Sequence, residues 1–277
     1  MMEINKVHAV YFSATGNTKR LTEEIAGSIA SKFGVAYEVY DFTRPADRGE
    51  QKQFYEQELV VFGTPVYAGR VPNKVLPMVQ SLFEGSGALA IPIVTFGNRS
   101  FDNGLIELRN ELEKHGFHTI AGAAFAAEHA FSHKLAAGRP DEKDWKEVQQ
   151  FIEKTADKID RMTEIPKRIS VKGEEPIPDY YRPLGIDGKP AVFLKAKPKT
   201  ADGCTGCKAC VSVCPMGSID PDDPTKVHGI CIKCHACIKE CPAGVKYFDD
   251  EAFLSHVQML EQTYRRRAEN EFFYNES

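Results

Sequence analysis

All eight cysteines of the 277-residue chain lie between positions 204 and 241. They form two runs, CTGCKACVSVCP from residue 204 and CIKCHACIKECP from residue 231, which share the spacing C-x2-C-x2-C-x3-C-P. Thiols clustered at this spacing, in a chain that begins without a recognisable export signal, favour metal or redox chemistry over a disulfide framework. We therefore expect a protein of the reducing cytoplasm.

Each run places four soft sulfur ligands within eleven residues, which is the spacing used to bind iron-sulfur cubanes. Structural zinc is the alternative, but a zinc site normally takes two separated C-x2-C pairs and leaves the third cysteine of each run without a role. Small residues precede both third cysteines (Ala209, Ala236), and glycines follow both prolines (Gly217, Gly244). These residues suit a backbone that must closely approach a bulky inorganic cluster.

Composition narrows the partners of the protein. The net charge of −4, with 27% charged residues, predicts no dominant surface for polyanions, so nucleic acid is not an expected partner. No apolar stretch is long enough for a membrane span. A chain of 277 residues exceeds one ordinary core and predicts about two domains.

The first part of the chain alternates apolar runs with amphipathic helical patterns, which is typical of a parallel sheet covered by helices. Strands are predicted over residues 7–12, 35–40, 58–63, 88–95 and 118–126. A last helix is predicted near Pro140, with acidic residues in its first turn. Its apolar stripe includes Trp145, the single tryptophan, which we expect to pack on the sheet rather than contact a cofactor.

The turn after the first strand, SATGNTKR at residues 13–20, carries small hydroxyl residues and a glycine. Such a turn into a helix offers N–H groups, hydroxyls and the positive end of the helix dipole to a phosphate. It is not a Walker loop, and GSGALA at 85–90 is no dinucleotide fingerprint because it precedes a strand. The alternative is an ordinary helix start capped by Asn17 or Thr18.

Two further loops, TPVYAGRVPNK at 64–74 and FGNRSFDNG at 96–104, follow the third and fourth predicted strands. In a sheet ordered 2-1-3-4-5 these loops lie beside the first turn, at the switch point where ligands bind. Each loop carries a candidate aromatic for a planar ligand. The alternative for both aromatics is a loop anchor that packs on its own scaffold.

The two cysteine runs resemble those of two-cluster bacterial ferredoxins, in which the fourth cysteine of each run ligates the other cluster. The resemblance implies two 4Fe-4S clusters. One would be held by Cys204, Cys207, Cys210 and Cys241, and the other by Cys231, Cys234, Cys237 and Cys214.

The three loops together resemble the FMN site of flavodoxins. The resemblance implies that Tyr67 and Phe101 flank the isoalloxazine, although the loop at 64–74 lacks the tryptophan of many flavodoxins. The loop that begins with Thr64 and Pro65 belongs to the implied site, the amides of Gly97 and Asn98 meet the pyrimidine edge, and the phosphate is held by Ser13, Thr15, Gly16, Asn17 and Thr18. His129, His133 and Arg139 border this region, but histidines there more often make loop hydrogen bonds, and all three stay outside the predicted site.

Along its whole length the chain resembles the ferredoxin-flavodoxin fusion family of anaerobes. The resemblance implies an α/β fold, with a flavodoxin-like doubly wound five-stranded parallel sheet (order 2-1-3-4-5) and a C-terminal two-cluster ferredoxin-like domain. We expect an FMN-binding domain at 1–164, a linker packed on the surface at 165–199, a ferredoxin domain at 200–248 and a helical tail at 249–277.

These features predict an electron-transfer protein that passes electrons between two 4Fe-4S clusters and FMN, and exchanges them with a partner protein or a small carrier. The alternatives are a flavin-dependent reductase of a small organic substrate or quinone, and a redox sensor. No catalytic acid or base stands out in the flavin loops. The sequence YRRRAEN near the end of the tail is interpreted as solvated charge, with a docking patch as the alternative.

Overall fold

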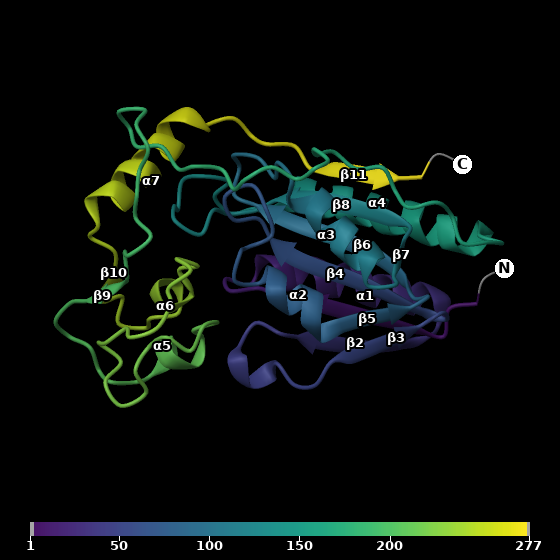
Figure 1. The fold of residues 1–277 in the computed structure, drawn as a ribbon, viewed down its shortest axis with the longest axis horizontal. Helices are drawn as coiled ribbons and strands as arrows, with labels where there is room; N and C mark the ends of the chain where they lie inside the picture. The colour runs from purple at the N-terminus through teal and green to yellow at the C-terminus, as the bar shows by residue number, and fades with distance from the viewer. Residues whose placement is uncertain (1–2, 276–277) are drawn as a thin grey trace.

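The computed structural model describes residues 3–275, and its largest feature is a twisted sheet (Figure 1). Its five parallel strands lie in the order β2-β1-β4-β6-β8, which is the predicted order. Their bounds are β1 (Lys6–Tyr11), β2 (Ala36–Asp41), β4 (Glu58–Pro65), β6 (Leu89–Phe96) and β8 (Ala121–Ala126). Parallel strands joined by crossovers bury both faces, and the apolar runs of the sequence reflect that burial.

The predicted count of five strands is wrong. Strand β11 (Glu271–Tyr274) comes from the far end of the chain and pairs antiparallel with β8, and the short β7 (His118–Thr119) pairs with β6. A separate two-stranded ladder joins β3 (Lys52–Tyr55) to β5 (Phe83–Ser86). The predicted turn within GSGALA is present, because residues 85–90 run from the end of β5 into β6.

Helices cover both faces of the sheet. On one face, α1 (Asn17–Phe33) and α4 (Glu142–Arg161) share a core with apolar side chains of β1, β4 and β6. On the other face, α2 (Leu76–Leu82) and α3 (Gly104–Lys114) enclose a second core rich in phenylalanine. Helix α4 begins with a capping box between Asp141 and Asp144, and Trp145 packs against the first core as predicted.

The cysteine runs form a small second part of the molecule, on the side of the sheet where the parallel strands end (Figure 1). It contains β9 (Lys199–Thr200), α5 (Ala209–Ser212), α6 (Ala236–Lys239) and β10 (Lys246–Tyr247), with β9 and β10 paired antiparallel. We refer to residues 3–164 as the sheet domain and to residues 200–248 as the cysteine domain.

The segment between the two domains runs along the sheet domain and is tied to it by hydrogen bonds. Tyr181 N–H donates to the Ala68 carbonyl at 2.9 Å, and the Tyr180 hydroxyl donates to the Val71 carbonyl at 2.8 Å. After the cysteine domain, α7 (Glu251–Thr263) leads into an extended tail that returns to the sheet as β11. The chain thus crosses between the two domains twice.

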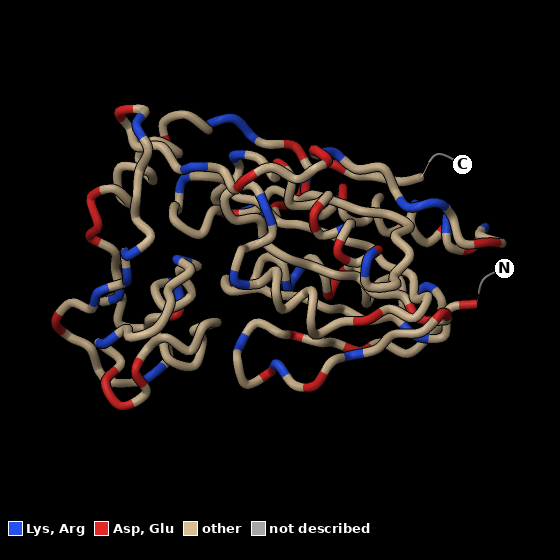
Figure 2. Tube along the Cα trace, in the orientation of Figure 1, with Lys and Arg blue, Asp and Glu red and all other residues tan. Residues whose placement is uncertain are grey.

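Charges of both signs are interspersed over the molecule, and the three consecutive arginines 265–267 stand out as a basic stretch of the tail (Figure 2). Within residues 3–275, we find no helix that combines the length and the apolar character needed to cross a membrane.

Candidate cofactor sites

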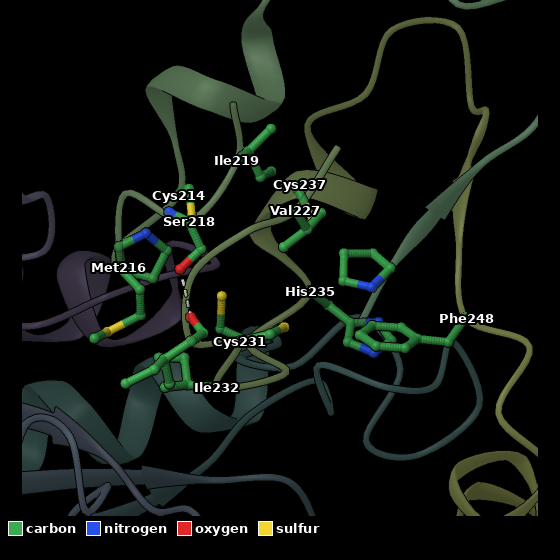
Figure 3. A pocket seen from close by; sticks show the side chains of 14 residues that line it. Cys214, Met216, Ser218, Ile219, Val227, Cys231, Ile232, His235, Cys237 and Phe248 are labelled. Carbon is green, nitrogen blue, oxygen red and sulfur yellow. Dashed lines mark hydrogen bonds between the residues drawn. The ribbon is translucent and has the colours of Figure 1, made fainter. Parts of the chain in front are cut away.

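The eight cysteines surround two separate cavities of the cysteine domain. The first cavity is lined by Cys214 of the first run together with Cys231, Cys234 and Cys237 of the second run (Figure 3), which we call the inner set. The second is lined by Cys204, Cys207, Cys210 and Cys241, which we call the outer set. The structure therefore brings together the cysteines that the crossed assignment groups, with the fourth cysteine of each run beside the other three.

The two runs repeat one backbone geometry around these cavities. The residues on either side of the second cysteine have positive φ in both runs, at 69° and 61° for Gly206 and Lys208, and at 55° and 62° for Lys233 and His235. Lysine and histidine rarely adopt this left-handed region, because it brings their Cβ too close to the backbone. Such strain persists where the surrounding structure requires it, often at ligand sites.

Backbone N–H groups are directed at several of the sulfurs. Ser218 N–H donates to Cys214 Sγ at 3.3 Å, and Lys233 N–H donates to Cys231 Sγ at 3.4 Å. At Cys241, burial alone would raise the pKa of the thiol, but hydrogen bonds from backbone N–H groups of residues 243–246 lower it. These N–H groups stabilise negative sulfur, which is the form that binds a metal.

Burial differs among the thiols: Cys234 and Cys237 of the inner set and Cys210 of the outer set are buried, whereas Cys204 and Cys207 of the outer set are exposed. Burial raises the pKa of Cys237 to about 12 and raises that of Cys234 further. Without a metal these thiols are neutral, so metal binding must release their protons. In the described part of the chain all eight cysteines are free thiols, and no three or more His, Cys, Asp or Glu side chains converge on the position of a single metal ion.

The predicted phosphate loop has the open geometry that an anion site requires. The N-cap of α1 is Gly16, with φ of 90°, and among the described residues no heavy atom lies within 4 Å of where its Cβ would stand. The Ser13 hydroxyl accepts a hydrogen bond from Lys19 N–H of the first turn at 3.0 Å, so neither Asn17 nor Thr18 is the cap residue. Ser13, Thr15 and Asn17 are half-buried at the same turn.

Thr18 does not lie where the prediction requires. Its side chain is buried, and its hydroxyl is 2.7 Å from the hydroxyl of Thr95 at the end of β6. The first turn of α1 directs this position toward the sheet, so Thr18 fastens the helix to β6 rather than facing the loop. Its hydroxyl is thus engaged with β6, and a phosphate contact through the backbone of Thr18 stays a prediction.

The second loop contains an unpaired polar atom next to the predicted site. Thr64 is fully buried at the end of β4, and its Oγ1 has no hydrogen-bond partner within residues 3–275. An unpaired buried hydroxyl is costly and marks a place where a ligand atom or water can bind. Pro65 follows it, partly buried.

Tyr67 lies at the base of a tight turn in the same loop. Tyr67 and Arg70 exchange backbone hydrogen bonds, while Ala68 and Gly69 between them have φ of 49° and 79°. This pair of positive φ values is typical of a type I′ turn. The tyrosine is partly buried, and its burial together with the nearby thiols of Cys234 and Cys231 raises the pKa of its phenol well above the ordinary value.

The third loop differs from the prediction at Phe101. Its side chain is only 2% exposed and belongs to the second core, with ring centroids 5.5 Å from Phe96 and 6.4 Å from Phe273 of β11. The ring is therefore not available to flank a flavin, and the alternative of a loop anchor is correct for this residue. Its partner Phe273 lies far away in the sequence, which explains why the local pattern was misleading.

Residues 264–268 of the tail form hydrogen bonds with Asn98 in the same loop. The sequence had indicated no role for the tail in this loop. Asn98, with φ of 67°, donates from its side-chain amide to the carbonyls of Tyr264 and Arg266, both at 2.7 Å, and accepts from Ala268 N–H at 3.1 Å. Arg266 donates in return to the Arg99 carbonyl at 2.9 Å. The tail thus holds the segment whose amides are predicted to meet the pyrimidine edge.

His129, which the sequence left outside the site, borders Gly97. A Cβ added at Gly97 would stand 2.2 Å from Cδ2 of His129, so only glycine fits beside the ring. The Nδ1 atom accepts a hydrogen bond from Phe131 N–H at 3.0 Å, and burial lowers the pKa of His129 to about 4. His133 is exposed, and Arg139 is buried in an ion pair with Asp144.

The cysteine domain is similar to a known protein family. Residues 203–245 match the family model of the 4Fe-4S dicluster domain. The cysteine domain is therefore of the iron-sulfur class rather than the zinc class. None of the curated protein sequences matches this chain.

Solved structures similar to the sheet domain include an archaeal flavodoxin (19% identity, 56% of this chain and 99% of that chain, TM-score 0.38). Flavodoxin 2 of Bacillus cereus is 14% identical, and the match covers 56% of this chain and 99% of that chain with a TM-score of 0.40. The rubredoxin oxygen:oxidoreductase of Desulfovibrio gigas is also 14% identical, and the match covers 57% of this chain and 37% of that chain with a TM-score of 0.40. The flavodoxin-like character of the sheet domain rests on its own strand order and on its loops at the carboxyl ends of the strands.

Proposed function

We propose that the protein transfers electrons, with FMN bound by the sheet domain and one 4Fe-4S cluster bound by each cysteine set. The observation that carries this proposal is the grouping of eight thiols around two cavities, beside the loops at the carboxyl edge of a doubly wound sheet. In this proposal residues 1–164 and 200–248 are the two cofactor domains, 165–199 is the linker and 249–277 is the tail.

The proposed phosphate site is the turn of Ser13, Thr15, Gly16 and Asn17. Its support is the open space beside Gly16 and the start of the 17-residue helix α1 directly behind it. No lysine or arginine needs to enter the turn, because the helix dipole and the N–H groups supply the positive potential.

The proposed ring site lies between the Thr64–Tyr67 segment and the Gly97–Asn98 segment. The free hydroxyl of Thr64 supplies a hydrogen-bonding atom, and Tyr67 remains the one predicted aromatic that is not in the core. Bound FMN would supply chemistry in one- or two-electron steps. The residues of this chain bind it, orient it and exclude water from it.

The direct test is the cofactor content of protein purified and reconstituted without oxygen. We expect about eight irons and about one non-covalent FMN per chain, which correspond to two four-iron clusters and one flavin. Zinc with little iron would refute the cluster assignment, and a chain that loads iron but no flavin would refute the FMN assignment. A protein partner or small carrier that exchanges electrons with this chain is part of the proposal.

Thr64→Val offers a specific probe of the flavin site. Valine keeps the buried shape while removing the unpaired hydroxyl, so the apo fold should not suffer. The dissociation constant of FMN, measured by quenching of flavin fluorescence, should rise by about fivefold with iron content unchanged. Ser81→Val is the matched control, since Ser81 lies on the exposed side of α2 and bonds only the Pro77 carbonyl.

A further inference from the structure

The two cysteine sets meet different parts of the molecule. In the described residues, two hydrogen bonds join the sheet domain to the cysteine domain: Arg48 to the Pro215 carbonyl at 2.6 Å, and Lys239 to Glu128 at 2.9 Å. Pro215 follows the inner-set Cys214, and Lys239 belongs to α6, which carries the inner-set Cys237. Both bonds therefore reach elements of the inner set.

Apolar contacts give the same result. Ile232, which follows Cys231, packs against the phenylalanine-rich core of the sheet domain. Phe131 of the loop after β8 lies 4.9 Å from the ring of His235, which follows Cys234.

The outer set faces away from the sheet domain. Residues 201–208, with Cys204 and Cys207 among them, are all exposed. At Gly206 and Gly244, beside outer-set cysteines, no heavy atom of the described residues lies within 4 Å of where a Cβ would stand. An external protein can therefore approach the outer set without displacing the sheet domain.

Arg48 is a cationic residue of the sheet domain that forms a hydrogen bond directly beside the inner set. Its guanidinium is half-buried and bridges three carbonyls, those of Phe42 at 3.0 Å, Thr43 at 2.6 Å and Pro215 at 2.6 Å. Burial lowers the pKa of Arg48, while Asp47 and the Cys214 sulfur act in the opposite direction. An arginine remains charged in a protein, so a positive charge stands beside Cys214.

Other cations near the cysteines belong to the cysteine domain or to the segment that leads into it. Lys233 donates to the Cys231 carbonyl at 3.1 Å, and Lys208 and Lys246 line the cavity of the outer set. Arg48 differs from these cations because it belongs to the sheet domain, and its hydrogen bond to the cysteine domain ends on Pro215, beside Cys214.

We infer that the inner centre is an interdomain site, in which Arg48 is a positioning residue that raises the reduction potential of the inner centre relative to that of the outer centre. The inference rests on the proposed binding of one cluster by each set. Reduction adds one negative charge to a cluster, and a fixed cation nearby stabilises the reduced form. Arg48 thereby shifts the partition of a shared electron toward the inner centre.

The experiment is a redox titration of the full cluster-loaded chain, followed by electron paramagnetic resonance. Cys234→Ser and Cys207→Ser assign each signal to the inner or the outer set. Arg48→Gln should lower the potential of the inner centre alone and change the partition of an electron between the two centres by about tenfold. Arg48→Lys keeps the charge and should restore most of the potential.

Two further variants complete the design. Arg161→Gln removes an exposed arginine at the last residue of α4, and it should leave both potentials unchanged. Asp47→Asn removes a negative charge that interacts with Arg48 and should raise the reduction potential of the inner centre. Asp47→Asn keeps Arg48 and its carbonyl contacts, so it tests the inference even if Arg48→Gln fails to retain iron.

The inference would be overturned if Arg48→Gln changed neither reduction potential, changed both equally, or changed only that of the outer centre. Failure of the proposed function itself would appear earlier, as wild-type protein that lacks iron or shows only one centre. If the wild-type protein has two normal centres and their reduction potentials do not change in the Arg48 and Asp47 variants, only the role of Arg48 is overturned.

Discussion

The inner and outer cysteine sets have almost the same sequence and local backbone, yet they occupy different environments. Each combines three cysteines of one run with the fourth of the other, and each has a left-handed residue after its second cysteine. The inner set adjoins the sheet domain, since Arg48 donates to the Pro215 carbonyl and Phe131 packs on the ring of His235, whereas the outer set borders an exposed loop. Spacing alone therefore determines how a run holds its ligand, and the rest of the fold determines what surrounds that ligand.

The largest expected difference follows the loss of one cysteine from each set. Cys207→Ser and Cys234→Ser should each lower the iron content by about half, since each removes a ligand of one proposed cluster. Cys234→Ser should also weaken FMN binding, because the inner run carries Ile232 and Lys239 to the sheet domain. Iron analysis and flavin fluorescence measure the two effects. Equal loss of FMN in both variants would contradict the distinction between the sets.

A smaller effect is expected from glycine at the two equivalent left-handed positions, Lys208 and His235. Glycine relieves the unfavourable backbone conformation at both, worth about 1 kcal/mol. Lys208 is exposed, so Lys208→Gly should be neutral or slightly stabilising. His235 is buried between Phe131 and Phe248, so His235→Gly should cost about 2–4 kcal/mol.

The stabilities of Lys208→Gly and His235→Gly can be compared by thermal melting of the cluster-loaded chain. The two variants should move the melting temperature in different directions or by clearly different amounts. Similar losses of stability would mean that the inner and outer runs are packed alike, and that the contact of His235 with the sheet domain contributes little.

The smallest effect concerns the ion pair between Glu128 and Lys239. Burial acts to raise the pKa of Glu128, but Lys239 and the Gly138 N–H outweigh it and lower the pKa below the ordinary value. A carboxylate with a lowered pKa contributes stability above its unfolded-state pKa, and this contribution is lost as the pH falls through the folded-state pKa. We expect a contribution of about 0.5 kcal/mol from this partly exposed pair.

The stability difference between the parent and Glu128→Gln should therefore shrink as the pH falls below the ordinary glutamate pKa of about 4.3. Both proteins should carry His133→Ala, because His133 lies 3.6 Å from the same carboxylate. Glu38→Gln, which breaks an exposed pair with Lys6, is the control, and it should leave the contact between the domains unchanged. A difference that stays constant with pH would exclude the ion pair as its source.

Local patterns predicted those features whose causes are local. The positions of the parallel strands, the packing of Trp145 and the open turn at Gly16 follow from periodicity, from helix signals and from the residues of one loop. Phe101 and Thr18 were misplaced because their partners, Phe273 and Thr95, are distant in the sequence. The role of Asn98 in holding the tail was missed for the same reason.

The sequence by itself determined the iron-sulfur class of the cysteine domain and the positions of the parallel strands, because ligand spacing and hydrophobic periodicity act over a few residues at a time. Only the tertiary structure decided which cysteine set faces the sheet domain, which loop residues stay open, and that the end of the chain returns to complete the sheet. These features arise from contacts between residues more than a hundred positions apart, and packing, rather than any local preference, selects such contacts.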